Sequence, residues 1–438
     1  MDSPDRSESL PVLVVGSGVA GLTAALDLAR IGVPVHVVER EGHLGGQVMH
    51  LDKLYPSDHC AFCPVWTEGA ACLTHPLITL HSHTTLEGLE SADGRIVAVL
   101  ATRPPAVSPD ACVFCGACKD ACDRKGVPGA IRFRPEALAW DPALPPTPFL
   151  DKNLCSRCGQ CASACPTGAI DPNRLDLPAR VARMPVADVI HAVGFTERSS
   201  LTVTEYHADG HPDVFSAMDY EAWTAEAGPN AGTIRRRSNG AIPRSVAFIQ
   251  CAGARDQRFL GYCSSVCCMH ALKQARWVKR RQPAASVAIF FTDLRAVGKG
   301  YESYARTAAT EAVTLVRSRP ALVFSLPEAG GGSTLAVRYE DFTTGKVITA
   351  EFDTVVLNGG LTACPLPGVS GAGTGNQSRD VGAPVTSAGG QKQTQDPAHQ
   401  TCGFCQEPGD VAQSVIQGSR AAALVAARLM NRAAGGVQ

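Results

Sequence analysis

Two runs of four cysteines constrain what this 438-residue chain can fold into more than any other feature of it. Both have the spacing C-x2-C-x2-C-x3-C, the first at Cys112, Cys115, Cys118 and Cys122 and the second at Cys155, Cys158, Cys161 and Cys165. In a small secreted protein, 18 cysteines would indicate disulfides. The polar, acidic start "MDSPDRSESLP" is not a signal peptide, so we expect a cytoplasmic protein in a reducing compartment. Clustered thiols there predict metal binding.

The spacing of the two runs is that of bacterial two-cluster ferredoxins, in which the fourth cysteine of each run ligates the other cluster. We therefore predict two [4Fe-4S] clusters, one on Cys112, Cys115, Cys118 and Cys165 and one on Cys155, Cys158, Cys161 and Cys122. Pro166 follows the last cysteine, as is usual, whereas Asp123 takes that place in the first run. Zinc is the alternative for C-x2-C pairs, but two complete runs without histidine argue against it.

The rest of the composition is that of an ordinary globular protein. The chain has 45% apolar residues, 18% charged residues and a formal net charge of -1. This balance gives no indication of nucleic acid or an anionic membrane surface as a partner. No apolar stretch approaches the roughly 20 residues that cross a bilayer, so we expect no membrane span.

A dinucleotide-binding motif lies near the start of the chain. An apolar strand, Pro11 to Val15, leads into G-x-G-x-x-G at Gly16, Gly18 and Gly21, and a helix and a second strand ending at Glu39 follow. The glycines allow a tight turn and a close approach of the backbone to a pyrophosphate, and the carboxylate can accept hydrogen bonds from a ribose. A glycine turn that only packs a helix is the alternative, and the complete βαβ context argues against it.

The motif alone does not separate FAD from NAD, but two further segments favour FAD. "GHLGGQ", which contains Gly45 and Gly46, resembles the second flavin-contacting segment of flavoproteins with two dinucleotide-binding domains. "EPGDVAQSVIQGSRAAALVAARLM", 407 to 430, resembles their closing motif, in which an aspartate, here Asp410, meets the ribityl-pyrophosphate region and a helix begins beneath the isoalloxazine ring. A plain surface helix capped by Asp410 is the alternative for this segment.

Two buried strands that end in glycine turns, "VADVIHAVGFTE" (186 to 197) and "FDTVVLNGGL" (352 to 361), indicate the overall organisation. Thioredoxin-reductase-like flavoproteins insert a second nucleotide domain between two such strands. We predict this α/β fold, with two dinucleotide-binding domains and an inserted 2x[4Fe-4S] ferredoxin module. The predicted parts are an FAD-binding domain in 8–107, 176–240 and 348–438, a ferredoxin domain in 108–175 and a degenerate pyridine-nucleotide domain in 241–347.

The second nucleotide domain lacks a glycine-rich phosphate loop. After the apolar run "SVAFIQ", Gly253 and Gly261 do not form G-x-G-x-x-G. Instead the chain carries C-x11-C-x3-C-C, enough thiolates for another [4Fe-4S] cluster, at Cys251, Cys263, Cys267 and Cys268. On spacing alone, this prediction and simple core packing are evenly matched, because free cysteine is commonly buried.

Five segments together resemble the HdrA-like family of heterodisulfide reductase components, which are FAD and iron–sulfur proteins: "LYPSDHCAFC", "CAGARD", "YCSSVCCMHALKQA", "FTDLRAVGKGYESY" and "CGFCQEPGDVAQSVIQGSRAAA". The resemblance implies a third [4Fe-4S] cluster beside the flavin, on Cys251, Cys263, Cys267 and Cys268. It also implies that Lys273 lies near the isoalloxazine ring, where a cation would stabilise reduced flavin; a solvated helix lysine is the alternative. The long methanogen form has ferredoxin-like modules at both ends, so this chain resembles a shortened member.

The resemblance further implies an oxidoreductase, the electron-transfer component of a heterodisulfide-reductase-like complex, with heterodisulfide chemistry on a different polypeptide. Its partners would be the other components of the complex and ferredoxin, a dehydrogenase or a hydrogenase, linked to a second acceptor by electron bifurcation or confurcation. Three alternatives stay open: a non-bifurcating relay to quinone or another carrier, an NAD(P)H-dependent disulfide reductase using Cys60 and Cys63, and a scaffold with structural clusters.

Several cysteines receive no firm role. His59, Cys60, Cys63 and Cys72 could hold a metal or form a redox pair, although packed or exposed thiols are favoured. Cys364, Cys402 and Cys405 stay unassigned. The Gly- and Ser-rich run from Gly368 to Gln395 predicts a flexible surface loop, and the Pro-rich segment between the two cysteine runs predicts a loop that packs on the neighbouring domain.

Overall fold

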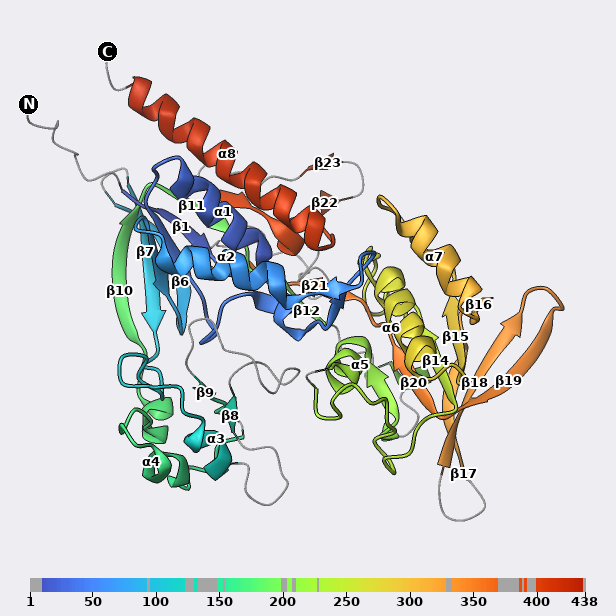
Figure 1. Cartoon of the computed structure of the whole chain (residues 1–438). Helices are drawn as coiled ribbons and strands as arrows, with labels where there is room; N and C mark the ends of the chain where they lie inside the picture. The colour runs from blue at the N-terminus through green and yellow to red at the C-terminus, as the bar shows by residue number, and fades with distance from the viewer. Residues whose placement is uncertain are drawn as a thin grey trace, which may run out of the picture.

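The computed structural model describes residues 10–92, 95–122, 130–132, 148–152, 154–197, 203–206, 210–226, 228–327, 333–368, 386–387, 390–391 and 399–435. Two parallel five-stranded sheets form the centres of two domains, and a small cysteine-bearing module lies beside the first (Figure 1). Most of the predicted loop from Gly368 to Gln395, and residues 133–147 between the cysteine runs, lie outside the described residues.

The first domain is built on the parallel sheet β24-β11-β1-β2-β5. Its strands are β1 (Val12–Val15), β2 (Val35–Val38), β5 (Ile78–His81), β11 (Asp188–His191) and β24 (His399–Thr401). Successive side chains of a strand point to opposite faces, so both faces of these apolar strands need cover. Val12 and Val14 pack against α1 (Val19–Arg30) and α8 (Val411–Gly435), and α2 (Phe62–Thr74) packs against α1.

The other face of this sheet is covered by a three-stranded antiparallel sheet. It has the order β10-β7-β6, from β6 (Thr84–Ala92), β7 (Arg95–Thr102) and β10 (Arg180–Val186). Leu13 and Val15 of β1 meet Leu86, Ala98 and Leu100 there. Short elements complete the domain: β3 (Lys53–Leu54) paired with β4 (His59–Cys60), the 3-10 helices η1 (Gly46–His50) and η6 (Gly403–Cys405), and the strand pair β22 (Thr386–Ser387) and β23 (Gly390–Gln391).

The cysteine module interrupts this antiparallel sheet between β7 and β10. It comprises α3 (Ala117–Cys122), β8 (Ile131–Arg132), β9 (Phe149–Leu150), α4 (Gln160–Ala164) and η2 (Pro172–Asp176). Ile131, Leu150, Cys161 and Ile170 form its small buried core. Figure 1 shows the module at the end of β10 and β7, below the first domain.

The second domain repeats the plan with the parallel sheet β13-β20-β14-β15-β16. The strands are β13 (Val214–Ser216), β14 (Ser245–Ile249), β15 (Ser286–Phe291), β16 (Val313–Arg317) and β20 (Thr354–Leu357). One face is covered by α5 (Ala217–Thr224), α6 (Cys267–Arg281) and α7 (Tyr301–Thr310). The other is covered by the antiparallel β17 (Leu322–Pro327), β18 (Ser333–Asp341) and β19 (Lys346–Phe352), and η4 (Thr204–Tyr206) lies beside β17.

Two strands of this second sheet lie outside the range 241–347 predicted for the domain. β13 precedes that range, and β20 follows it and comes from the segment "FDTVVLNGGL" that we expected in the FAD-binding part. The four residues of β20 are fully buried, and such a short apolar run does not indicate which parallel sheet it joins. The chain passes between the domains at β12 (Phe195–Glu197) and β21 (Leu361–Ala363), which pair antiparallel. None of the described helices has the length and apolarity to cross a membrane.

Candidate functional site

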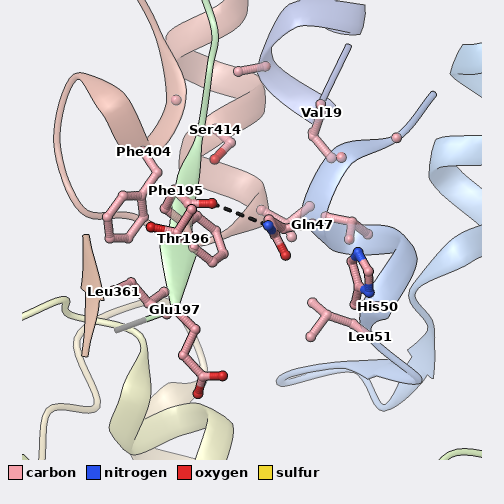
Figure 2. A pocket seen from close by; sticks show the side chains of 18 of the residues that line it. Val19, Gln47, His50, Leu51, Phe195, Thr196, Glu197, Leu361, Phe404 and Ser414 are labelled. Carbon is pink, nitrogen blue, oxygen red and sulfur yellow. Dashed lines mark hydrogen bonds between the residues drawn. The ribbon is translucent and has the colours of Figure 1, made fainter. Parts of the chain in front are cut away.

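A cavity of about 1140 Å³ lies between the two domains and is called here the nucleotide cavity. Its walls come from the glycine turn after β1, from the "GHLGGQ" segment, from the linker strands, from the start of α8 and from α6. In Figure 2, Gln47 and His50 face β12, and Gln47 Nε2 donates a hydrogen bond to the Phe195 carbonyl oxygen (3.2 Å). A cavity of this size can take a ligand as large as a dinucleotide.

The three glycines of the first motif have three different surroundings. A Cβ on Gly21 would lie 2.0 Å from the Gly16 carbonyl oxygen, and one on Gly16, which has φ +104°, would lie 2.4 Å from the Ala192 carbonyl oxygen. A Cβ on Gly18 would meet no protein atom within 4 Å. Gly18 lies at the N-terminus of α1 and lines the cavity, so the open space beside it fits a bound pyrophosphate.

We expect Gly18→Ala to weaken FAD binding by tenfold or more, about 1.4 kcal/mol, because its Cβ would occupy ligand space. Titration of deflavinated protein with FAD, followed by flavin fluorescence, measures this loss. The matched variant Gly21→Ala should instead destabilise the apoprotein, because its Cβ would overlap the Gly16 carbonyl oxygen. Wild-type FAD affinity in Gly18→Ala would contradict the placement of the pyrophosphate.

The second glycine segment packs directly against the first. The Gly45 N–H donates to the Ser17 carbonyl oxygen (2.9 Å), and a Cβ on Gly46 would lie 3.0 Å from the Gly18 Cα. Gly45 and Gly46 therefore form part of the same cradle and line the cavity, as the FAD prediction requires.

Glu39 also lines the cavity, at the end of β2. Its Oε2 accepts hydrogen bonds from the Ser17 N–H (2.9 Å) and Ser17 Oγ (2.5 Å), and its Oε1 accepts one from the Glu41 N–H (2.9 Å). A carboxylate oxygen can accept more than one hydrogen bond, so Oε1 retains capacity for a ribose hydroxyl. These bonds hold the side chain in the orientation that a ribose contact needs.

Asp410 lies where α8 begins. Its Oδ1 accepts from the Gln413 N–H (2.9 Å), and the Asp410 N–H donates to Gln413 Oε1 (3.2 Å), so the pair caps the helix. Tyr301 of the second domain donates a hydrogen bond to Asp410 Oδ2. Asp410, Val411 and Ala412 all line the cavity, so the positive end of the helix dipole faces it and would favour an anionic ligand.

Lys273 projects from α6 into the wall of the nucleotide cavity. It is only 6% exposed, which excludes the solvated helix lysine that the sequence left open. Its Nζ donates to the Lys53 carbonyl oxygen (2.8 Å) and pairs with Glu221, which is 3% exposed. Burial alone would raise the pKa of Glu221, but Lys273 and then His270 hold it well below its usual range. The cation predicted beside the flavin is thus balanced by a buried carboxylate.

Two titratable residues of the cavity were not singled out by the sequence. Burial raises the pKa of Glu197 to about 7, although Ser216 Oγ (2.7 Å) and the Met218 N–H (3.2 Å) donate hydrogen bonds that favour its charged form. Burial and then the charge of His43 lower the pKa of His50 to about 4. Both side chains appear in Figure 2. Their positions follow from the approach of the two domains, which no local pattern reports.

The four cysteines of the second domain line one small cavity, called here the four-cysteine cavity: Cys251, Cys263, Cys267 and Cys268. Cys251 follows β14, and Cys267 and Cys268 begin α6. The end of a strand and the start of the next helix are where such a domain would bind phosphate. Burial and then the charges of Cys268, Cys263 and Cys251 raise the pKa of Cys267 well above its usual value. Thiols this close become thiolates when a metal centre binds them, which fits an iron–sulfur cluster.

Cys267 lines both the four-cysteine cavity and the nucleotide cavity. Asn358, which follows β20, also lines both. A cluster in the first cavity and a flavin in the second would therefore be neighbours across these two residues. This shared wall is not visible in the spacing of the cysteines along the chain.

In the cysteine module, the fourth cysteine of each run lies with the other run. Cys112, Cys115, Cys118 and Cys165 line one cavity. Burial and then the charges of Cys122, Cys155 and Cys158 raise the pKa of Cys161, so these four thiols are also close together. Both groupings fit the predicted ligand sets. Backbone N–H groups donate to the two crossing sulfurs, from Ala169 to Cys165 Sγ (3.3 Å) and from Ala130 to Cys122 Sγ (3.1 Å).

The cysteine module reaches the nucleotide cavity through β9 and the residue after it. Phe149 and Asp151 line the cavity, and the Phe149 ring lies 5.7 Å from the His43 ring. The Cys155 N–H donates to the Asp151 carbonyl oxygen (3.0 Å), so the second predicted ligand set begins four residues from the cavity wall. Sequence reasoning expected this segment to pack on the neighbouring domain but did not place it at the flavin site.

The remaining cysteines do not gather into a further site. Cys60 is partly buried and Cys63 exposed, whereas Cys72 is buried with its sulfur 3.9 Å from the Leu22 carbonyl oxygen. Cys364 lines the nucleotide cavity, and Cys402 and Cys405 are buried. In the described ranges, no three His, Cys, Asp or Glu side chains could hold one metal ion. A [4Fe-4S] cluster does not need this, because each thiolate binds a different iron.

The fold and the nucleotide cavity define a thioredoxin-reductase-like protein with two dinucleotide-binding domains. Thioredoxin reductase from Lactococcus lactis matches 97% of this chain and 100% of its own, with a TM-score of 0.52 and 15% identity. The model of the NAD(P)-binding Rossmann-like domain matches residues 14–61, and that of the 4Fe-4S binding domain matches residues 148–171. These matches confirm the predicted fold class and support FAD and [4Fe-4S] clusters as cofactors.

The relatives identify the chain more narrowly, and all three are HdrA-type components of heterodisulfide reductases. That of the CoB--CoM heterodisulfide reductase of Methanocaldococcus jannaschii is 34% identical over 81% of this chain and 54% of its own length. One from Methanopyrus kandleri is 33% identical over 98% of this chain and 65% of its length. That of the H(2):CoB-CoM heterodisulfide,ferredoxin reductase of Methanothermobacter marburgensis is 31% identical over 80% and 53%.

These relatives confirm the predicted resemblance. The chain is a relative of the HdrA-type iron–sulfur components of heterodisulfide reductases, and it spans about half to two thirds of their length.

Proposed function

We propose that this chain is the FAD and iron–sulfur electron-transfer component of a heterodisulfide-reductase-like complex, and hence part of an oxidoreductase. One observation carries the proposal: Cys267 lines both the nucleotide cavity and the four-cysteine cavity. A cluster held there would exchange electrons with the flavin across the thickness of one residue. The phosphate site of a nicotinamide cofactor is replaced by this electron port.

The cysteine module supplies the second connection to the flavin. Phe149 and Asp151 line the nucleotide cavity, and Asp151 bonds to the backbone of Cys155. We infer the order of centres as module clusters, flavin, third cluster. FAD exchanges electrons in pairs and each cluster carries one, so this order can divide or collect a pair of electrons.

Partners are inferred from the module surface and from the relatives. Cys115 and Cys158 are exposed, and Val113 and Leu154 beside the runs are 64% and 48% exposed, so electrons can enter here from a docked protein. The Methanothermobacter marburgensis relative is named as part of a heterodisulfide,ferredoxin reductase. We therefore propose that one partner is ferredoxin, a dehydrogenase or a hydrogenase, that other components of the complex lead to a second acceptor, and that the protein lies in the cytoplasm.

Direct NAD(P)H-dependent disulfide reduction is less well supported. Cysteines take the position of the second phosphate loop, and Cys60 and Cys63 are not among the residues that line the nucleotide cavity. Reduction of the flavin by NADH at a rate similar to that by ferredoxin would favour this function instead.

Anaerobic stopped-flow mixing with reduced ferredoxin tests the proposal. We expect ferredoxin to bleach the flavin in the wild-type chain and NADH not to do so. Cys158→Ser should slow this bleaching by tenfold or more, about 1.4 kcal/mol in the barrier, because it removes a ligand of the entry cluster. Cys63→Ser, a change of another exposed cysteine, is the control and should leave the rate unchanged. Electron uptake by the flavin in one step would indicate bifurcation, and uptake in two steps a simple relay.

A further inference from the structure

Two buried side-chain amides in the wall of the four-cysteine cavity have polar atoms without a partner. Gln250 follows β14 and Asn358 follows β20, two neighbouring parallel strands in which Ile249 is paired with Leu357. Each residue is 2% exposed, and each lines the cavity. Among the described residues, Gln250 Nε2, Gln250 Oε1 and Asn358 Nδ2 find no hydrogen-bond partner.

The backbone around these amides is well bonded, which holds them in place. The Gln250 N–H donates to the Phe290 carbonyl oxygen, and the Asn358 N–H to the Ile249 carbonyl oxygen, both at 2.9 Å. The Asn358 carbonyl oxygen accepts from the Ala252 N–H at 2.9 Å. An unsatisfied buried polar group costs about 1–3 kcal/mol, so two rigid amides beside one cavity indicate that an acceptor belongs in it.

The chemistry of the cavity indicates which acceptor this is. Its other walls carry four cysteine sulfurs, and the one acid among them, Asp293, is already paired with Arg255 and Arg295. The sulfides and thiolates of a [4Fe-4S] cluster are negatively charged hydrogen-bond acceptors. Hydrogen bonds to cluster sulfurs stabilise the more negative, reduced state and raise the reduction potential.

We propose that Gln250 and Asn358 are positioning residues that set the potential of the third cluster. Their side-chain N–H groups donate hydrogen bonds to sulfur atoms of the cluster held by Cys251, Cys263, Cys267 and Cys268. Asn358 also lines the nucleotide cavity, so one of these donors lies between the cluster and the flavin. This inference rests on the third cluster of the proposed function.

Redox titration of the whole holoprotein, followed by EPR, tests it with Gln250→Met and Asn358→Leu. Each variant should lower the equilibrium constant for reduction of the third cluster about tenfold, which is 59 mV for one electron. Iron content and the flavin potential should not change. Thr354→Val is the matched control: Thr354 is on β20, is 1% exposed, and its Oγ1 also lacks a partner in the described part of the chain, but it does not line the cavity.

A second measurement needs no variant. In wild-type protein labelled with 15N in the glutamine and asparagine side chains, pulsed EPR of the reduced cluster should show coupling to amide nitrogen. An iron content of about eight per chain in the wild type would remove the third cluster and the proposed function with it. About twelve irons with unshifted potentials and no 15N coupling would leave that function intact and overturn this inference. A shift of only the flavin potential in Asn358→Leu would overturn the assignment of Asn358.

Discussion

Changing both Cys267 and Cys268 to serine lowers the iron content of the anaerobically purified protein from about twelve to about eight atoms per chain, with an equal loss of acid-labile sulfide. Both cysteines line the four-cysteine cavity, and serine does not replace a thiolate as an iron ligand there. FAD should stay bound, because its predicted cradle is built from the first domain around Gly16, Gly18 and Glu39.

Iron, sulfide and FAD analysis of the purified variants checks this expectation. Cys72→Ser is the control, because Cys72 is also buried but lies in α2, against Leu22. It should keep about twelve irons. If the wild-type chain already holds only about eight, the four cysteines are core packing, and the flavin has no second electron exit in this chain.

Replacing Lys273 with methionine should destabilise the second domain by about 3–5 kcal/mol. The change leaves Glu221 buried and without its ammonium partner, although His270, Gln274 and the Asp52 N–H still donate to it. Urea unfolding followed by hydrogen exchange of 267–281 measures the loss. The double variant Lys273→Met, Glu221→Gln should recover most of the stability, because it also removes the uncompensated charge.

The effect of this change depends on pH in a defined direction. The pKa of Glu221 in the folded protein lies below its unfolded value of about 4.5. Stability from the pair is therefore fully present above that pH and is lost as the pH falls toward the folded pKa. The difference between wild type and Lys273→Met should be largest near neutral pH and should narrow below pH 4.5. A constant difference across this range would show that the pair does not stabilise the domain.

The flavin provides a separate measure of Lys273. If the lysine contacts the isoalloxazine ring, as the resemblance implies, Lys273→Met lowers the flavin potential even where the protein is fully folded. Lys273→Arg keeps the cation and should preserve that potential. A flavin potential that is the same in all three proteins would leave Lys273 as a structural partner of Glu221 alone.

The sequence by itself determined the features whose geometry is local. The turn at Gly16, Gly18 and Gly21 and the strands before and after it lie where they were predicted, because backbone sterics and apolar spacing act over a few residues. The cysteine runs indicated iron–sulfur chemistry for the same reason. Spacing of thiols along a short loop limits which cluster they can hold.

Only the tertiary structure decided what distant segments do together. β13 and β20 join the second sheet although short buried strands carry no sign of their sheet, and Lys273 pairs with Glu221 across 52 residues of chain. The shared wall at Cys267 and the unpartnered amides of Gln250 and Asn358 exist because strand ends and a helix start converge between two domains. Burial and hydrogen-bond satisfaction are properties of that convergence, and no local pattern encodes them.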